Sequence, residues 1–489
     1  MTLSITTKSR WIVVLGSDHS VVISEHNQEK EAYESAANYS AEHGGVVMRV
    51  KGANFDVVST PVVIDQPAPS EPSSSSASPS PVDPPATDGG FTVFDPEASH
   101  KVPIDATNEQ IQQALNTYTD IAFPANMVVE NAQFAFTRNH QNIFTYGQGN
   151  RPKFIKANDG INNDVFKNDT RTIDHLHVQG LEVFSEKGLR ESNGIWIRLS
   201  GTSGQYASHI RFEDVLVTGF NNGIGVVDDW ARNNNNESRI SQVELHRGII
   251  HRQYASDASH SIPLYVEGVV NTDITETCFD MAGWLRPEHR NKRSHCIYAQ
   301  QFGGPTQATD SWFLRAAANA AQFRSGCKDF SRNIVSECSL GPWITEKYGV
   351  IEDNVLLDQT DILPPPTGET ISSESRGHGF MGGTNVRRNI ATRRGGTQKN
   401  HPAYMGLYGT VENNYAIAWA ENNQNFDIGG VRYENHNTNK SIEVDPGLPQ
   451  VTESMIQSLT SRRLGVWDAN VHSTAPFRKQ CWDIVQEYV

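Results

Sequence analysis

The sequence predicts an all-β solenoid, in which the short strands of successive coils stack into long parallel sheets. After about residue 120 there is almost no helical periodicity, and short β-rich runs alternate with Gly, Asn and Asp. Two kinds of run also recur along this region, one centred on an asparagine and one on an alternating apolar pair. Recurrence of this kind is typical of solenoids, because each coil buries its apolar face only against its neighbours.

The first recurring run places an asparagine at one position of each coil. The intervals of about 20 to 35 residues fit one coil each, with loop insertions in the longer gaps. An asparagine at such a turn can adopt the left-handed conformation and hydrogen-bond to the asparagines above and below it. The four runs are SRNIVSE with Asn333, EDNVLLD with Asn354, RRNIATR with Asn389 and ENNYAIA with Asn414.

The second recurring run has the two-residue period of a strand, so alternate residues point into the solenoid. Its members are GIWIRLS (194–200), GIGVVDD (223–229), PLYVEGV (263–269), CIYAQQ (296–301), AAQFRSG (320–326), GPWITEK (341–347), GHGFMGG (377–383) and YMGLYGT (404–410). The predicted inward pairs are Ile195 and Ile197, Ile224 and Val226, Leu264 and Val266, Ile297 and Ala299, and Ala321 and Phe323.

The residues between these pairs are predicted to form two outward columns on one parallel sheet. Flat aromatic faces suit sugar rings, and Arg, Glu and Gln suit hydroxyls and carboxylates. A loop or a second subunit covering the columns is the alternative, although burying the charged members under a plain interface is costly. The first column is Trp196, Gly225, Tyr265, Tyr298, Gln322, Trp343, Gly379 and Gly406, and the second is Arg198, Val227, Glu267, Gln300, Arg324, Thr345, Met381 and Tyr408.

The segments outside the repeats predict the domain organisation. Residues 1–58 indicate a small α+β module, with strands at RWIVVLG, HSVVIS and VVMRV and a helix at EKEAYESAANYSAEHGG, and residues 59–90 are a Pro/Ser-rich linker. A capping helix opens the solenoid of residues 91–446, with Thr107 as its N-cap and Ile111, Ala114, Leu115 and Tyr118 on one face. Residues 447–489 are predicted to cap the solenoid or to join subunits.

Composition limits the partners of the chain. A formal net charge of -15 argues against a nucleic-acid partner and against anionic membranes. The apolar run near the N-terminus is shorter than a signal-peptide core of about 7 to 15 residues, and no stretch approaches the roughly 18 apolar residues of a membrane span. No signal peptide is therefore expected. The cysteines, Cys278, Cys296, Cys327, Cys338 and Cys481, form no CxxC pair and are expected to be buried thiols.

With these repeats the chain resembles the right-handed parallel β-helix, or pectate-lyase-like, polysaccharide-degrading proteins. The order of small module, linker, capping helix and solenoid is similar to that of a phage tailspike depolymerase. The resemblance covers about residues 91–445 and implies a polysaccharide substrate from a bacterial capsule, an exopolysaccharide or an alga. It also implies a homotrimer, attachment to a virion through the N-terminal module, and a location on the phage tail or outside the cell after lysis.

Two mechanisms are compatible with the outward columns. A lyase acting on a uronate-containing polymer needs a cation, a base and an acid. Arg324 and Arg198 are the candidate cations, and Tyr298 or His295 the proton-transfer groups. A hydrolase needs two carboxyl groups instead, for which Glu267 with Asp228 or Asp229 on the adjacent coil are the candidates. The presence of two arginines with one glutamate in the second column places the lyase ahead.

Several other expectations concern the same surface. Trp196, Arg198, Tyr265, Gln300, Gln322, Trp343 and His378 are the predicted substrate-binding residues. No cofactor is expected, with calcium at Asp228 and Asp229 as a weak alternative. The motifs NTD (271–273), DD (228–229) and GHG (377–379) occur in the wrong order for a polygalacturonase-like glycosidase and are interpreted as chance. The Pro-rich loop after Asn354 is expected to form one wall of a groove, and a non-catalytic glycan-binding spike remains open.

Overall fold

In the computed structural model the chain divides into two compact units, Met1–Thr87 and Asp88–Val489, which we describe separately. The described residues are 11–15, 22–26, 48–52, 99–156, 164–168, 172–185, 193–200, 204–234, 238–253, 261–286, 289–290, 294–345, 349–359, 379–383, 385–393, 402–407, 409–419, 426–427 and 438–489.

The first unit contains a three-stranded antiparallel sheet in the order β2-β1-β3. Its strands are β1 (Trp11–Leu15), β2 (Val22–His26) and β3 (Met48–Gly52), which overlap the three predicted strands, although β2 and β3 each end two residues later than predicted. The helix predicted between β2 and β3 and the linker of residues 59–90 lie outside the described residues.

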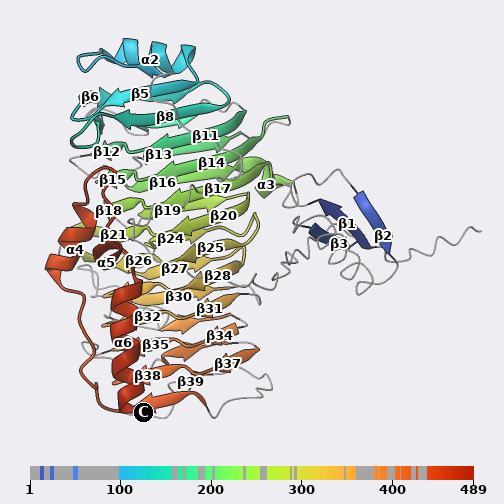
Figure 1. Cartoon of the computed structure of the whole chain (residues 1–489), viewed down its shortest axis with the longest axis vertical. Coiled ribbons are helices and arrows are strands. Elements are labelled where there is room, and N and C mark those ends of the chain that lie inside the picture. The colour runs from blue at the N-terminus through green and yellow to red at the C-terminus, as the bar shows by residue number, and fades with distance from the viewer. Residues whose placement is uncertain are drawn as a thin grey trace, which may run out of the picture. The chain divides into compact units, whose positions relative to one another are not determined.

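The second unit is a parallel β-helix. Each coil contributes one strand to each of three parallel sheets, so that each strand pairs with strands of the preceding and following coils (Figure 1). This arrangement fits the predicted right-handed solenoid. The 11-stranded sheet 1 consists of β7 (Phe134–Phe136), β10 (Phe166–Asn168), β13 (Asn193–Leu199), β16 (Asn222–Asp228), β19 (Ile262–Glu267), β24 (Ile297–Ala299), β27 (Asn319–Phe323), β30 (Leu340–Ile344), β33 (Phe380–Met381), β36 (Tyr404–Met405) and β39 (Phe426–Asp427).

The other two sheets complete the coils, each with 12 strands. Sheet 2 consists of β4 (His100–Lys101), β5 (Asp120–Pro124), β8 (Gln141–Tyr146), β11 (Ile173–Gln179), β14 (Ala207–Glu213), β17 (Ile240–His246), β20 (Val269–Thr275), β25 (Thr306–Thr309), β28 (Cys327–Ser331), β31 (Val350–Glu352), β34 (Asn385–Arg387) and β37 (Thr410–Glu412). Sheet 3 consists of β6 (Val128–Ala132), β9 (Lys153–Lys156), β12 (Glu182–Phe184), β15 (Leu216–Thr218), β18 (Ile249–Gln253), β21 (Cys278–Ala282), β26 (Trp312–Leu314), β29 (Ile334–Ser336), β32 (Val355–Leu357), β35 (Ile390–Thr392), β38 (Tyr415–Ile417) and β40 (Lys440–Ile442).

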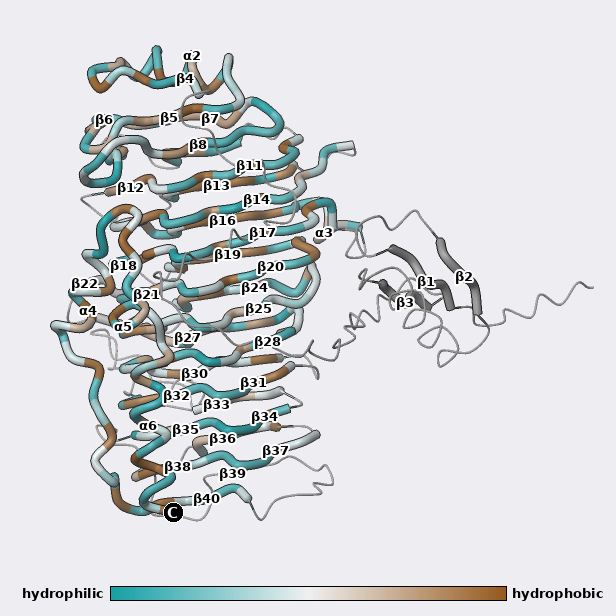
Figure 2. The backbone as a smooth tube through the Cα atoms, in the orientation of Figure 1, coloured by the Kyte–Doolittle hydropathy of each residue, from teal (hydrophilic) through white to brown (hydrophobic). Residues whose placement is uncertain are grey.

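The core runs along the axis of the solenoid. The predicted inward pairs of sheet 1 all belong to it, from Ile195 and Ile197 to Ala321 and Phe323. Their register is also as predicted, since Ile195 pairs with Ile224, Ile224 with Leu264, and Leu264 with Ile297. Hydrophobic and hydrophilic stretches alternate along the coils (Figure 2), because the outward side chains and the turns are polar while the inward ones are not.

The predicted asparagine ladder is present and fully buried. The side-chain amide of Asn354 donates to Asn389 at 2.9 Å, and the amides of Asn389 and Asn414 donate to Asn414 and Asn439 at 3.0 Å each. The expected left-handed conformation is not at the asparagines. The preceding residue adopts it in each coil, as at Arg332 with φ of 59°. The asparagine side chains then bind the backbone groups that this turn leaves unpaired.

Helix α2 (Asn108–Thr117) packs on the first coils. Thr107 caps it as predicted, and Ile111, Ala114 and Leu115 are buried in the core. Tyr118, predicted on the same face, lies outside it: it is the C-cap residue, 41% exposed, and stacks on His100 with ring centroids 3.8 Å apart. The short helix α3 (Asp229–Asn233) follows β16, and an antiparallel hairpin, β22 (Trp284–Arg286) and β23 (His289–Arg290), follows β21.

The C-terminal segment lies along the outer face of sheet 3, with α6 beside its later coils (Figure 1). It contains α4 (Glu453–Thr460), α5 (Ala469–His472) and α6 (Ala475–Tyr488). Phe477 packs against Trp312, and Arg462 binds Asp214 at 2.7 Å in a buried ion pair. The segment thus covers the side of the solenoid, whereas an end cap was one of its two predicted roles, and the joining of subunits stays a prediction.

Two further features concern the chemistry of the chain as a whole. The five cysteines are free and buried, as expected, and burial raises the pKa of the Cys278, Cys296 and Cys327 thiols. Among the described residues, no helix is both long and apolar enough to cross a membrane.

Candidate functional site

The outer face of sheet 1 between β13 and β24 gathers most of the predicted site residues. In register, Trp196 pairs with Gly225, Gly225 with Tyr265, and Tyr265 with Tyr298. The second predicted column runs beside it, with Arg198 paired to Val227 and Val227 to Glu267. The two-residue period of the strands therefore puts the aromatic and the polar residues on the same outward face.

Aromatic rings from three of four successive coils line this face. The Trp196 and Tyr265 rings are nearly parallel, at 7°, with centroids 6.1 Å apart. The Tyr298 ring follows at 5.7 Å from Tyr265 and is tilted by 55°. The three rings together form an apolar surface of the kind that packs against flat ligand faces.

Tyr298 is the centre of a second group of candidates. The His295 ring lies 5.2 Å from the Tyr298 ring, and the Arg324 guanidinium lies 5.4 Å from the ring centroid in a cation–π contact. The predicted neighbourhood of Tyr298 and Arg324, one coil and one position apart, is thus found in the structure. The Tyr298 ring thus has an imidazole and a cation as neighbours.

Glu267 lines a cavity of about 390 Å³. The Glu267 side chain accepts a hydrogen bond from the Tyr265 hydroxyl at 2.6 Å and is only 1% exposed. A carboxyl group held in this way against aromatic rings is oriented and shielded from bulk water. The cavity is lined by Trp196, Arg198, Asn222, Val227, Asp229, Ile262, Tyr265, Glu267, Tyr298 and Gln300.

The adjacent carboxylates Asp228 and Asp229 have different surroundings. Asp229 lines the cavity and accepts from the Arg198 Nε at 2.7 Å. Asp228 is fully buried: it caps α3 through the backbone N–H of Trp230 and binds the Arg239 guanidinium. Asp228 thus stabilises the turn after β16, and Asp229 is the one of the two that a ligand can meet. Because each carboxylate is paired with an arginine, the calcium alternative receives no support from this arrangement.

The residues of the outward columns are less exposed to solvent than the repeats predict. Glu267, Tyr298 and Gln322 point outward but are 1%, 6% and 3% exposed. The neighbouring rings and Arg324 account for the burial of Tyr298. The face is therefore a lined cavity rather than an open strip of side chains.

Two predicted binding residues lie outside the cavity lining. Gln322 and Trp343 pair with each other on β27 and β30, further along sheet 1. His378 lies outside the described residues, as do Tyr408 and the predicted wall loop after Asp358–Gln359. Gln300, by contrast, lines the cavity.

The predicted register is wrong in the last coils. Trp343 pairs with Met381, and Met381 with Met405, where the aligned repeats put Gly379 and Gly406. The strands there are only two residues long, so the inward apolar residues are Phe380 and Tyr404, which stack at 5.3 Å. Aromatic stacking in the core sets the register of these coils, and the repeated glycines do not.

Asn222 is a cavity residue that the repeats did not single out. Its amide donates to the Asn193 side chain at 2.8 Å, and Asn193 donates to the Asp164 carboxyl at 2.7 Å. Burial raises the pKa of Asp164, although the hydrogen bond from Asn193 opposes that shift. A signal was present in the sequence: both NGIW and NGIG begin with asparagine, one residue before the aligned runs.

No protein-family model matches the chain, and no curated protein matches it. Among solved structures, the chain is similar to the crystal structure of tailspike protein 3 of bacteriophage CBA120, with 9% sequence identity and a TM-score of 0.25. The match covers 71% of this chain and spans about 60% of the length of that chain. At these values the likeness carries no functional weight, so function is inferred from the cavity.

Proposed function

We propose that this protein is a polysaccharide depolymerase whose cavity on sheet 1 binds a sugar residue next to the bond that is cleaved. One observation carries the proposal: Glu267 and Asp229, the two carboxylates that bond cleavage can use, line the same cavity as Trp196, Tyr265 and Tyr298. Aromatic platforms beside carboxyl groups suit the apolar faces and the hydroxyls of a sugar ring.

The cavity lining supports hydrolysis as the first mechanism. Glu267, buried and hydrogen-bonded to Tyr265, is the candidate proton donor to the leaving oxygen. Asp229, oriented by Arg198, is the candidate nucleophile or base. A separation of about 5–5.5 Å between two such carboxyl groups gives retention of the anomeric configuration, and about 6.5–9.5 Å gives inversion.

A specific observation also supports β-elimination on a uronate-containing polymer. The Tyr298 ring lies 5.2 Å from the His295 ring and 5.4 Å from the Arg324 guanidinium. In such a reaction Arg324 neutralises the uronate carboxylate, and Tyr298 or His295 takes the proton next to it. Arg198 is less suited to the cation role because Asp229 already occupies its Nε–H.

The wider proposals follow from this activity. The substrate is proposed to be a bacterial capsular, exopolysaccharide or algal glycan, and the chain a phage tailspike that assembles as a homotrimer. Residues 1–58 are the proposed virion attachment module. A non-catalytic glycan-binding spike is the competing function, because the aromatic platform by itself suffices for binding.

The test is an incubation with acidic and neutral polysaccharides in which reducing ends and the ultraviolet absorbance of unsaturated uronates are followed together. Reducing ends without absorbance that disappear in Glu267→Gln and Asp229→Asn support hydrolysis. Absorbance that disappears in Arg324→Ala and Tyr298→Phe supports elimination. Glu244→Gln, an outward carboxylate of sheet 2, is the matched control. A polymer that binds but yields neither product would overturn the enzyme proposal and favour the spike.

A further inference from the structure

We propose that His140, Asp174 and His175 form a binding site for a divalent transition-metal ion of the zinc type. The three residues lie where the strands β8 and β11 of sheet 2 begin, whereas the cavity described above lies on sheet 1. The inference is therefore independent of the depolymerase proposal. Nothing in their spacing along the chain marks these residues as a cluster, since Asp174 and His175 follow His140 by 34 and 35 positions.

The coil register brings the two histidines together. Gln141 pairs with Leu176, so the preceding residues His140 and His175 are neighbours on adjacent coils. Both are in the left-handed region, with φ of 55° and 56°, as is His209 on the next coil with 42°. Their rings stack, with centroids 4.9 Å apart for His140 and His175 and 4.6 Å for His175 and His209. A residue in this conformation interrupts the in-out alternation of the strand, as a bulge does.

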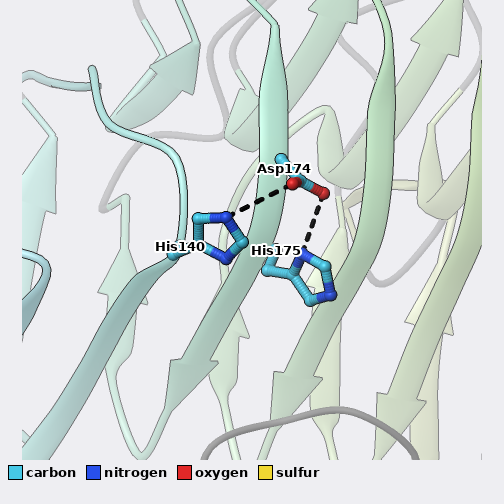
Figure 3. Close-up of side chains that lie close together, drawn as sticks. All are labelled: His140, Asp174 and His175. Atoms are coloured by element: carbon cyan, nitrogen blue, oxygen red, sulfur yellow. Dashed lines mark ion pairs between the residues drawn. The ribbon is translucent and has the colours of Figure 1, made fainter.

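One carboxylate lies between the two imidazoles. The Nε2 atom of His140 is 3.3 Å from Oδ2 of Asp174, and the Nδ1 atom of His175 is 2.8 Å from Oδ1 (Figure 3). The three donor atoms all lie within 4.8 Å of one another. An ion bound at about 2.0–2.2 Å from each donor fits such a triangle after small rotations of the side chains.

Hydrogen bonds hold both the side chain and the backbone of Asp174 in place. The Ser208 hydroxyl donates to its Oδ1, and its backbone N–H donates to the Asn139 side chain at 3.2 Å. These contacts orient the carboxylate, whose two oxygens face the two imidazoles.

The donor set selects the class of ion. Two imidazole nitrogens and one carboxylate suit zinc, cobalt or nickel, whereas calcium and magnesium prefer oxygen ligands alone. The His140 side chain is 65% exposed and those of Asp174 and His175 are 24% and 28% exposed, so an ion can enter from solvent and keep water as a further ligand. Stacking on His209 restricts the rotation of the His175 ring and preorganises the site.

The experiment is isothermal titration of the full-length, chelator-treated protein with zinc chloride, followed by cobalt chloride with absorption spectroscopy. We expect one tightly bound ion per chain and a cobalt spectrum with the visible bands of nitrogen coordination. His140→Ala and His175→Ala should each weaken that site by at least about 10-fold. A zinc-dependent rise in melting temperature should be lost in the same variants.

Because the chain has 17 histidines, the variants decide where the ion binds. His177→Ala is the matched control: it removes an imidazole of the same strand β11 that pairs with Glu213 instead. His140→Gln removes the ligand at an exposed position without a cavity, so its circular dichroism and melting curve separate loss of binding from loss of folding. Binding that survives the double change at His140 and His175, or that is equally weakened by His177→Ala, would overturn the proposal.

Discussion

The Trp196 ring lies over Gly225, in the space that a side chain of the neighbouring strand would fill. A Cβ atom at Gly225 would be 1.9 Å from the Trp196 ring. The absence of this atom lets Trp196 lean across β16 and stack on Tyr265, two coils away. Strands are about 4.8 Å apart, so without this gap the two rings would be separated by roughly twice that distance.

Gly225→Ala is therefore expected to push Trp196 off Tyr265 and to weaken glycan binding by about 10-fold, close to the 1.4 kcal/mol that one ordered aromatic contact contributes. The affinity for a bound oligosaccharide is the measurement. Trp196→Ala provides the control background, because there Gly225→Ala should have no further effect. Equal losses in both backgrounds would mean that Gly225 acts on the backbone and not through Trp196.

Substitution of the adjacent carboxylates Asp228 and Asp229 should affect different properties, stability in the first case and activity in the second. Asp228→Asn breaks a buried ion pair with Arg239, so we expect the free energy of unfolding to fall by about 3 kcal/mol or more. Asp229→Asn should change it by less than about 1 kcal/mol, because Arg198 is 53% exposed, yet abolish turnover. Chemical denaturation and product assays on both variants are the measurements. A stable but inactive Asp228→Asn protein would contradict the structural role of Asp228 and assign it the catalytic role instead.

The asparagine ladder should carry stability that single exposed amides do not. Asn389 is fully buried; its amide donates to Ile351, Arg387 and Asn414, and its oxygen accepts from Asn354. Asn389→Ala leaves several of these groups unsatisfied and should cost about 2–4 kcal/mol in urea denaturation. Asn385→Ala on the neighbouring strand β34 removes an exposed amide and should cost little. Similar losses for both would argue against the ladder as a stabilising element.

Glu213 predicts a pH dependence of stability. Burial opposes ionisation, but the hydrogen bond with His177 and the charge of Arg211 lower its pKa to about 2. Since the unfolded value is near 4.5, the folded state binds fewer protons, and the stabilisation is full above that value and lost as the pH falls toward 2. At pH 7 Glu213→Gln should cost up to about 3 kcal/mol.

The difference between Glu213→Gln and the unaltered protein should then shrink as the pH is lowered from 5 to about 3. Thermal unfolding at each pH measures it. The comparison is Glu412→Gln, which changes a half-buried carboxylate on β37. A stability difference for Glu213→Gln that stays constant with pH would exclude the ionised carboxylate as the cause.

The sequence predicts this fold well because the two-residue period of a strand appears directly as alternating apolar and polar residues. Ile195, Ile224 and Leu264 occupy the same inward position on successive coils. The alternation of apolar and polar residues within each strand predicts this position without information on distant contacts. The left-handed residue was misplaced by one position, to Asn333 instead of Arg332, because the ladder asparagine is more conspicuous than the turn residue before it. Where strands shrink to two residues, at Met381 and Met405, the pattern is too short to fix a register.

The candidate site was predictable as columns and not as a cavity. Column membership follows from register, which is why Trp196, Tyr265 and Glu267 meet as expected. Which of two adjacent carboxylates is accessible depends on Arg239, eleven residues after Asp228, reaching back across a turn. The histidine cluster depends on left-handed backbone at three successive coils, which no local signal in the sequence announces.

The lateral position of residues 447–489 has a consequence for the order of folding. Contacts between neighbouring coils join residues about one coil apart in the chain, such as Asn333 and Asn354, so each coil can dock on the previous one as it leaves the ribosome. Arg462, by contrast, binds Arg151 through its carbonyl oxygen across 311 residues and pairs with Asp214. These contacts of Arg462 cannot form until every coil between has been synthesised. They would therefore form late in folding, and by joining coils that are already folded they would slow unfolding of the solenoid.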